Sequence, residues 1–273
     1  MDKVVAADGT AIAFDRIGDG PPLILVDGAL CYRASGPNGQ LARQLASDFT
    51  VMTYDRRGRG DSGDSPRYAI EREVDDLEAL IKEAGGSVYL YGISSGAALA
   101  LEAARHGLPV DKLLLYEAPF VVDDSRSPVP PSYASELDEL VAADRRADAV
   151  RLFMSKGVGL SGMVVAMMRF MPAWSKLKGV AHTLPYDAAL TGDLQHGHDL
   201  PADRWDTVTM PTLVVVGGKS PTWMRNAMRA LADVLPNAGH RTLDGQSHIV
   251  SPKALAPVVT EFFTSDATGD KER

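Results

Sequence analysis

The chain has 273 residues, of which 45% are hydrophobic and 23% charged, and its formal net charge is −8. This length suits one α/β domain with an inserted subdomain, and the acidic balance argues against nucleic acid as a partner. A single cysteine, Cys31, excludes an intrachain disulfide framework. The sequence contains neither a run of ~20 apolar residues nor the apolar core of a signal peptide. We therefore expect a cytoplasmic protein without a membrane partner.

Short apolar segments alternate along the chain with segments of helical periodicity. A hairpin is expected over 3–16, where Asp8-Gly9 supplies the turn. The later strands are expected at 22–28, 49–55, 88–93, 112–119, 211–218 and 240–244, and the helices at 38–48, 73–86, 95–106, 222–234 and 252–263. Continuous apolar strands are typical of a sheet that is buried on both faces. The alternation therefore predicts an α/β fold with a mostly parallel sheet covered by helices on both faces.

A long segment interrupts this alternation between Pro119 and Pro211. It lacks a strand signal, contains several prolines, and has helical segments near 132–156 and 160–170. Such a length is unusual for a simple connection within a compact domain. A helical cap over the carboxyl ends of the strands, where open α/β sheets bind ligands, fits better. The predicted domains are a core of residues 1–119 and 211–264, a helical cap of residues 120–210, and a disordered tail of residues 265–273.

The sequence GISSG at 92–96 matches the pattern G-x-S-x-G. A buried strand precedes it and a helix rich in small residues follows, which is the context of a sharp turn that lifts the middle serine out of the sheet. We predict Ser94 as a nucleophile. Ser95 would begin the helix, where its backbone N–H is free to bind an anion. The alternative is a purely structural turn between strand and helix.

With this turn, the chain resembles the α/β-hydrolase family over nearly its whole length. The loop TYDRRGRGDSGDS at 53–65 is similar to the family's loop after the fourth strand, and we interpret it as structural. The family places its catalytic base in the loop before the last helix, here LDGQSHIV, which implies His248. Imidazole titrates near neutrality and can accept the serine proton. The alternative is an exposed loop histidine. The HGH sequence at 196–198 lacks further metal ligands nearby, and we expect neither a metal nor a cofactor.

The chain departs from the family at the catalytic acid. Most members carry an aspartate after the seventh strand, where this sequence has Ser220 in VVGGKSP. A serine hydroxyl cannot supply the negative charge that stabilises an imidazolium. Glu117, in LLLYEAPF at the end of the strand after the nucleophile's helix, is the best replacement and keeps the order serine, acid, histidine. A structural glutamate at the rim is the alternative interpretation, and Asp244 is a weaker rival for the acid.

Fungal zearalenone lactonases, within this family, are similar to the chain at five separate points. These are Asp-Gly in the oxyanion loop (26–28), a double serine followed by Gly-Ala (94–97), a glutamate before a proline (116–119), a seventh-strand loop without an acid (217–221), and a cap tryptophan after a proline (171–174). The resemblance implies that Glu117 is the acid and that Trp174 contacts the substrate.

Backbone N–H groups are expected to form an oxyanion hole beside Ser94. We assign this role to Ser95 and to Gly28 or Ala29, because such donors need no particular side chain. The cap is rich in methionine and aromatic residues, which favours an apolar substrate pocket, although ordinary packing between cap helices explains them as well. The candidate substrate contacts are Asp27, Met171, Trp174 and His182.

These residues predict a serine hydrolase that cleaves a small apolar carboxylic ester or lactone through an acyl-enzyme, with the triad Ser94, His248 and Glu117. One alternative on the same fold is a cofactor-free oxidoreductase or perhydrolase. Another is a non-catalytic ligand-binding protein, an interpretation to which Ser220 in the usual acid position gives some weight. The sequence leaves the oligomeric state open.

Overall fold

The computed structural model describes residues 1–265, so the predicted tail lies outside the described residues except for Ser265. Within this range, one sheet of eight strands runs in the order β1-β2-β4-β3-β5-β6-β7-β8. The strands are β1 (Asp2–Val5), β2 (Ala11–Ile17), β3 (Pro22–Val26), β4 (Thr50–Tyr54), β5 (Val88–Ile93), β6 (Val110–Tyr116), β7 (Thr212–Gly217) and β8 (Ala238–Leu243).

The sheet is parallel from β4 to β8, whereas β1 and β2 form an antiparallel hairpin at one edge and β2 pairs antiparallel with β4. This confirms the predicted mostly parallel α/β sheet. The register places Val26 opposite Gly92, and Tyr116 opposite both Ile93 and Val215. Because parallel strands end at the same edge, the residues that follow β3, β5 and β6 meet along one rim.

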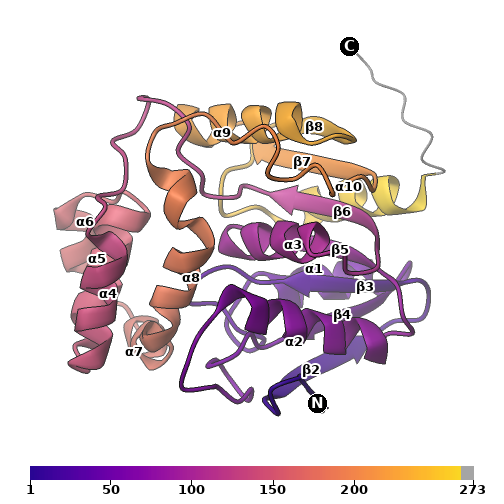
Figure 1. Ribbon diagram of the computed structural model, residues 1–273, viewed down its shortest axis with the longest axis horizontal. Helices are drawn as coiled ribbons and strands as arrows, with labels where there is room; N and C mark the ends of the chain where they lie inside the picture. The colour runs from indigo at the N-terminus through magenta and orange to yellow at the C-terminus, as the bar shows by residue number, and fades with distance from the viewer. Residues whose placement is uncertain (266–273) are drawn as a thin grey trace.

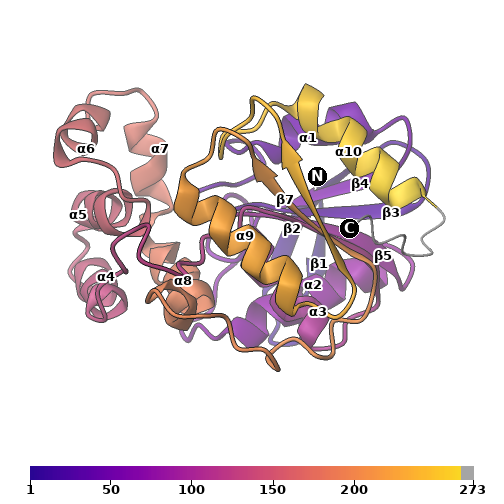
Figure 2. The ribbon, with the colours of Figure 1, turned by 90° about the horizontal axis from the view of Figure 1, so that it is seen from above.

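Helices cover both faces of the sheet (Figure 2). Apolar side chains of α2, α3 and α9 pack on one face, and those of α1 and α10 pack on the other. The elements are α1 (Asn38–Leu45), α2 (Ile70–Glu83), α3 (Ser95–Arg105), α9 (Thr222–Val234) and α10 (Pro252–Thr264). Almost all residues of β5 and β6 are buried, which explains their continuous apolar sequences.

Strand β6 ends earlier than the sequence pattern predicts. The expected strand extended to Pro119, but pairing stops at Tyr116 and Glu117 adopts a positive φ of 48°. A non-glycine residue in this region is strained and turns the chain sharply. Glu117 is therefore the first residue beyond the strand, at the sheet rim.

The segment between β6 and β7 is helical, and most of it lies to one side of the sheet with α8 next to the core (Figure 1). Its elements are α4 (Tyr133–Ala142), α5 (Arg146–Leu152), η1 (Phe153–Gly157), α6 (Gly162–Met168), α7 (Trp174–Gly179), η2 (Ala181–Thr183), α8 (Leu184–Thr191) and η3 (Gly192–Gln195). Asp144, with a φ of 51°, divides the expected segment 132–156 into α4 and α5. Sequence analysis did not anticipate α7 and α8. Pro185 lies in the first turn of α8, where a helix tolerates proline.

In residues 1–265, no helix combines the length and the apolar composition needed to cross a bilayer.

We predict that Gly96→Ala lowers the free energy of unfolding by about 3 kcal/mol, the upper range for overpacking. A Cβ at Gly96 would lie 2.6 Å from the Asp27 carbonyl oxygen, and this backbone cannot rotate away. Gly179→Ala is the matched control, because a Cβ at this helical glycine meets no atom within 4 Å. Equal urea midpoints for the two variants would contradict the prediction.

Candidate active site

Ser94 occupies the turn between β5 and α3. Its φ of 58° and ψ of −129° are strained for a serine and place its side chain above the strand ends. The oxyanion loop, residues 27–31, lies beside it. A Cβ added to Gly28 would come within 3.5 Å of Ser94 Oγ, so the absence of a side chain at Gly28 permits this close approach.

Glu117 lies next to His248 at the rim. Its Oε2 accepts a hydrogen bond from His248 Nδ1 at 2.8 Å. The carboxylate is fully buried, and its Oε1 accepts hydrogen bonds from the Gly217 N–H and from Ser220 Oγ. A buried carboxylate needs such donors, because leaving it unpaired would be costly. Ser220, at the position where most family members carry an acid, therefore donates to the acid instead.

The bond to Glu117 determines the tautomer of His248. A carboxylate can only accept, so Nδ1 carries the proton, and Nε2 of a neutral ring is left as an acceptor. Two hydrogen bonds hold the loop that carries His248. Tyr116 Oη donates to the Ser247 carbonyl and the Lys219 N–H donates to the Gln246 carbonyl, both at 2.7 Å. The His248 side chain is 43% exposed and is accessible to a substrate.

A cavity of about 390 Å³ lies between the strand ends and the cap. Ser94, Ser95, Ala29 and His248 line it, so the predicted nucleophile, base and two of the oxyanion candidates share one space. Most of the remaining lining is apolar and comes from both cap and core, including Tyr133, Phe153, Val158, Leu160, Ala188, Pro221, Trp223 and Met224.

The four candidate substrate contacts lie elsewhere. Trp174 is buried in the cap core, whereas Met171 is 53% exposed. Asp27, the first residue of the oxyanion loop, is buried against Gly36, where burial raises its pKa to about 7 although Arg59 and Arg56 oppose the shift. His182 is partly buried, and burial lowers its pKa.

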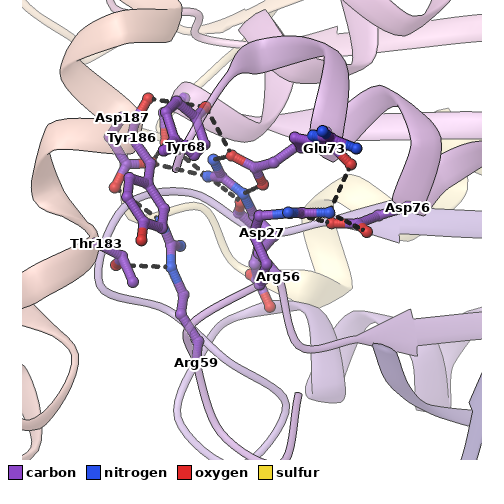
Figure 3. A network of polar contacts seen from close by, with 12 residues as sticks. Asp27, Arg56, Arg59, Tyr68, Glu73, Asp76, Thr183, Tyr186 and Asp187 are labelled. Carbon is purple, nitrogen blue, oxygen red and sulfur yellow. Dashed lines mark hydrogen bonds and ion pairs between the residues drawn. The ribbon is translucent and has the colours of Figure 1, made fainter. Parts of the chain in front are cut away.

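A network of buried ion pairs lies beneath the cavity (Figure 3). Asp187 of α8 accepts from Arg56 Nη1 at 2.8 Å and from Arg59 Nη2 at 2.7 Å. Ser95 Oγ donates to the same carboxylate at 2.7 Å. Burial would raise the pKa of Asp187, but the two guanidinium groups outweigh it and hold the pKa below its ordinary value. Asp187 also lines the cavity.

The network continues into the core through α2. Glu73 accepts two hydrogen bonds from Arg56, each at 2.7 Å, and a third from Tyr68 Oη at 3.0 Å. Arg57 is equally buried but faces another way, pairing with Asp76 and Asp8 without touching the cavity. The loop after β4 is thus tied into the fold by ion pairs, in keeping with its structural interpretation.

Sequence analysis missed Asp187. The available signal was RRGRG at 56–60, three arginines directly after a buried strand. Buried arginines require carboxylates nearby. That requirement does not identify the partner, since Asp187 lies in a segment where no helix was expected.

The sequence profile of the alpha/beta hydrolase family matches residues 20–258. The chain belongs to the alpha/beta hydrolase family. An alpha/beta hydrolase from Sphaerobacter thermophilus DSM 20745 is 52% identical, with a TM-score of 0.89, over 96% of this chain and 100% of that chain. The family and fold predicted from the sequence are thereby confirmed.

Two further similarities are more distant. The esterase RhEst1 from Rhodococcus sp. ECU1013 is 20% identical, with a TM-score of 0.65, over 97% of this chain and 98% of that chain, which shows the shared fold. The uncharacterized hydrolase YraK of Bacillus subtilis (strain 168) is 32% identical over 114 residues, which are 40% of this chain and 41% of YraK. The narrower likeness to zearalenone lactonases stays a prediction.

We predict that Glu117→Gln lowers kcat for ester hydrolysis by about 10³- to 10⁴-fold, as expected when the histidine loses its orienting carboxylate. Glutamine keeps the shape of the side chain but has no charge to stabilise an imidazolium. Steady-state kinetics on a chromogenic ester measures the effect. Asp244→Asn, at an exposed aspartate of the same loop, is the control and should retain wild-type kcat. Near-wild-type activity in Glu117→Gln would refute the assignment of the acid.

A second prediction concerns pH. Because burial raises the pKa of Asp27 from 3.8 to about 7, the folded chain holds a proton there that the unfolded chain releases. This contribution to stability is full at low pH and is lost as the pH rises through about 7. Asp27→Asn is neutral at every pH, so its Tm should fall less than that of the wild type between about pH 5 and about pH 8. Parallel Tm profiles would contradict this reasoning.

Proposed function

We propose that the chain is a serine hydrolase that cleaves a carboxylic ester or lactone through an acyl-enzyme on Ser94. The observation that carries the proposal is the 2.8 Å bond from His248 Nδ1 to buried Glu117, made at the rim of a cavity that Ser94 also lines. This bond leaves Nε2 of the neutral imidazole as the proton acceptor. A nucleophile, a base and an orienting acid are the groups that acyl transfer requires.

In the first half of the reaction, Ser94 Oγ attacks the carbonyl carbon while His248 Nε2 takes its proton. Negative charge moves to the carbonyl oxygen, and the charge of Glu117 stabilises the imidazolium. The tetrahedral intermediate collapses when the bond to the alkoxy oxygen breaks and the imidazolium gives its proton to this leaving group. In a lactone, the leaving alcohol stays attached to the acyl group, because the ester bond is part of a ring.

Backbone donors stabilise the charge on the carbonyl oxygen. Ser95 is the first residue of α3, so its N–H has no acceptor within the helix. Gly28 lies next to Ser94, and Ala29 lines the same cavity. Each donor of this kind contributes about 3 kcal/mol to lowering the barrier.

Water completes the cycle. His248 takes a proton from a water molecule, which attacks the acyl carbon, and then returns a proton to Ser94 Oγ as the ester bond to the enzyme breaks. The free carboxylic acid leaves and the resting enzyme is restored.

The cavity supports an apolar substrate. Its lining is mostly aliphatic and aromatic, and burial of such surface on a ligand contributes about 25 cal/mol per Å². About 390 Å³ accommodates a small molecule. We include lactones among the proposed substrates because the chain resembles zearalenone lactonases at Glu117 and in the oxyanion loop.

We predict that a fluorophosphonate probe labels the chain at Ser94 and that Ser94→Ala abolishes both labelling and hydrolysis. Mass spectrometry of the labelled peptide distinguishes Ser94 from the neighbouring Ser95. A panel of esters and lactones matched in size should show higher kcat/KM as the acyl group becomes more apolar. An unlabelled, inactive wild-type chain would favour the ligand-binding alternative and overturn the proposal.

A further inference from the structure

The oxyanion loop contains a strained residue. Leu30 adopts a φ of 61°, a left-handed conformation that costs a branched side chain about 1–3 kcal/mol. Such a conformation persists only where its surroundings impose it. The Cys31 N–H donates to the Gly28 carbonyl at 3.3 Å and closes a turn around Leu30, and a buried arginine binds the carbonyls at both ends of that turn. Arg59 Nη1 donates to the Gly28 carbonyl at 2.7 Å and to the Cys31 carbonyl at 3.3 Å.

These bonds determine the direction of a catalytic donor. In a trans peptide, the carbonyl of one residue and the N–H of the next lie in one plane and point in opposite directions. When Arg59 holds the Gly28 carbonyl, it therefore also fixes the Ala29 N–H. Ala29 lines the cavity beside Ser94, so the fixed N–H belongs to the predicted oxyanion hole.

Arg59 is in turn held by the segment from η2 to α8. Its Nε donates to Thr183 Oγ1 at 3.0 Å and its Nη2 donates to Asp187 at 2.7 Å. Asp187 also accepts from the hydroxyl of Ser95, the residue that supplies the other oxyanion donor. Both sides of the hole are thus bonded to one buried ion-pair cluster.

We propose that Arg59, anchored by Asp187 and Thr183, is a positioning residue that shapes the oxyanion hole without touching the substrate. The proposal rests on the proposed function, because it assumes that negative charge develops beside Ser94. Its structural part, that Arg59 imposes the conformation of residues 28–31, is independent of any substrate.

The test compares Arg59→Lys with Arg57→Lys. Lysine keeps the charge but cannot reproduce the planar fork that reaches Thr183, Asp187 and the loop carbonyls together. Arg57 is the matched control, because it comes from the same loop, is equally buried and ion-paired, and contacts neither the oxyanion loop nor the cavity. Both variants should lower Tm. A fall in kcat that occurs only in Arg59→Lys therefore reflects lost positioning and not general destabilisation.

Kinetics per active site, titrated with the fluorophosphonate, gives the first readout. We expect Arg59→Lys to lower kcat by about 10- to 100-fold with KM changed by less than about threefold, because the missing interaction acts in the transition state. Arg57→Lys should keep kcat within about twofold. If Arg59→Lys retained wild-type kcat, or if Arg57→Lys lost as much, the inference would be overturned.

Hydrogen exchange supplies the readout that needs no substrate. Peptides covering residues 28–32 should exchange faster in Arg59→Lys than in the wild type, and remain unchanged in Arg57→Lys. Unchanged exchange in Arg59→Lys would refute the positioning role. A wild-type chain without esterase activity would instead refute the proposed function.

Thr183→Val provides a milder variant should Arg59→Lys fail to fold. It replaces by a methyl group the fully buried hydroxyl that accepts from Arg59 Nε and donates to the Val180 carbonyl. We expect kcat to fall about three- to tenfold with little change in KM. An unchanged kcat in a folded Thr183→Val variant would count against the anchoring.

Discussion

The burial of three guanidinium groups beneath the active-site rim is the constraint on which the arrangement of this chain depends. Arg56, Arg57 and Arg59 are all almost completely buried. Burying a charged side chain costs several kcal/mol unless an opposite charge pairs with it. The carboxylates that pair with them come from the β1–β2 turn, from α2 and from α8. Segments far apart in the sequence are therefore held in one relative position.

The same physical rule explains the surroundings of Glu117, the proposed catalytic acid. A carboxylate at the end of β6 is as deeply buried as the arginines, and Glu117 is stable there because the Gly217 N–H, Ser220 and His248 all donate to it. A second acid at position 220 would place two carboxylates side by side in a buried site, where like charges resist ionisation. Serine at 220 avoids this repulsion and donates a hydrogen bond to Glu117.

Backbone strain is concentrated at the same rim. In the described part of the chain, four non-glycine residues have a positive φ, and Leu30, Ser94 and Glu117 are three of them. They supply, in order, the oxyanion loop, the proposed nucleophile and the proposed acid. Strain of this kind remains only where surrounding contacts over-determine the conformation. The buried ion pair between Arg59 and Asp187 and the three hydrogen bonds to Glu117 are contacts of this kind.

Sequence reasoning predicted the features that depend on local pattern. Continuous apolar strands, glycines at turns and the small-residue helix after Ser94 gave the sheet, the helices and the turn, because each is encoded within a few residues. Glu117 was inferred because its strand end had to share the rim with Ser94. The end of β6 was missed, since a positive φ at Glu117 is imposed by tertiary contacts that no local pattern records.

Helix α8 and the cavity-lining residues of the cap were not predicted for a different reason. Helix α8 is buried on several sides and has no clear polar face, so its periodicity is weak. Trp174 and Met171 were named as substrate contacts from the resemblance and from residue type, whereas the cavity is lined by Ala188, Thr191 and residues of other elements. Residue type alone does not distinguish cap residues that face the cavity from those that pack within the cap.

Helix α8 has two roles that follow from its position. Ala188 and Thr191 line the cavity, while Asp187 on the same helix binds both Arg56 and Arg59. A helix is rigid over such a distance, so a ligand that shifts Ala188 also shifts Asp187. The bonds from Asp187 lead through Arg59 to Gly28 and directly to Ser95. Contact between a ligand and α8 is thereby connected, through one buried carboxylate, to the backbone donors of the proposed oxyanion hole.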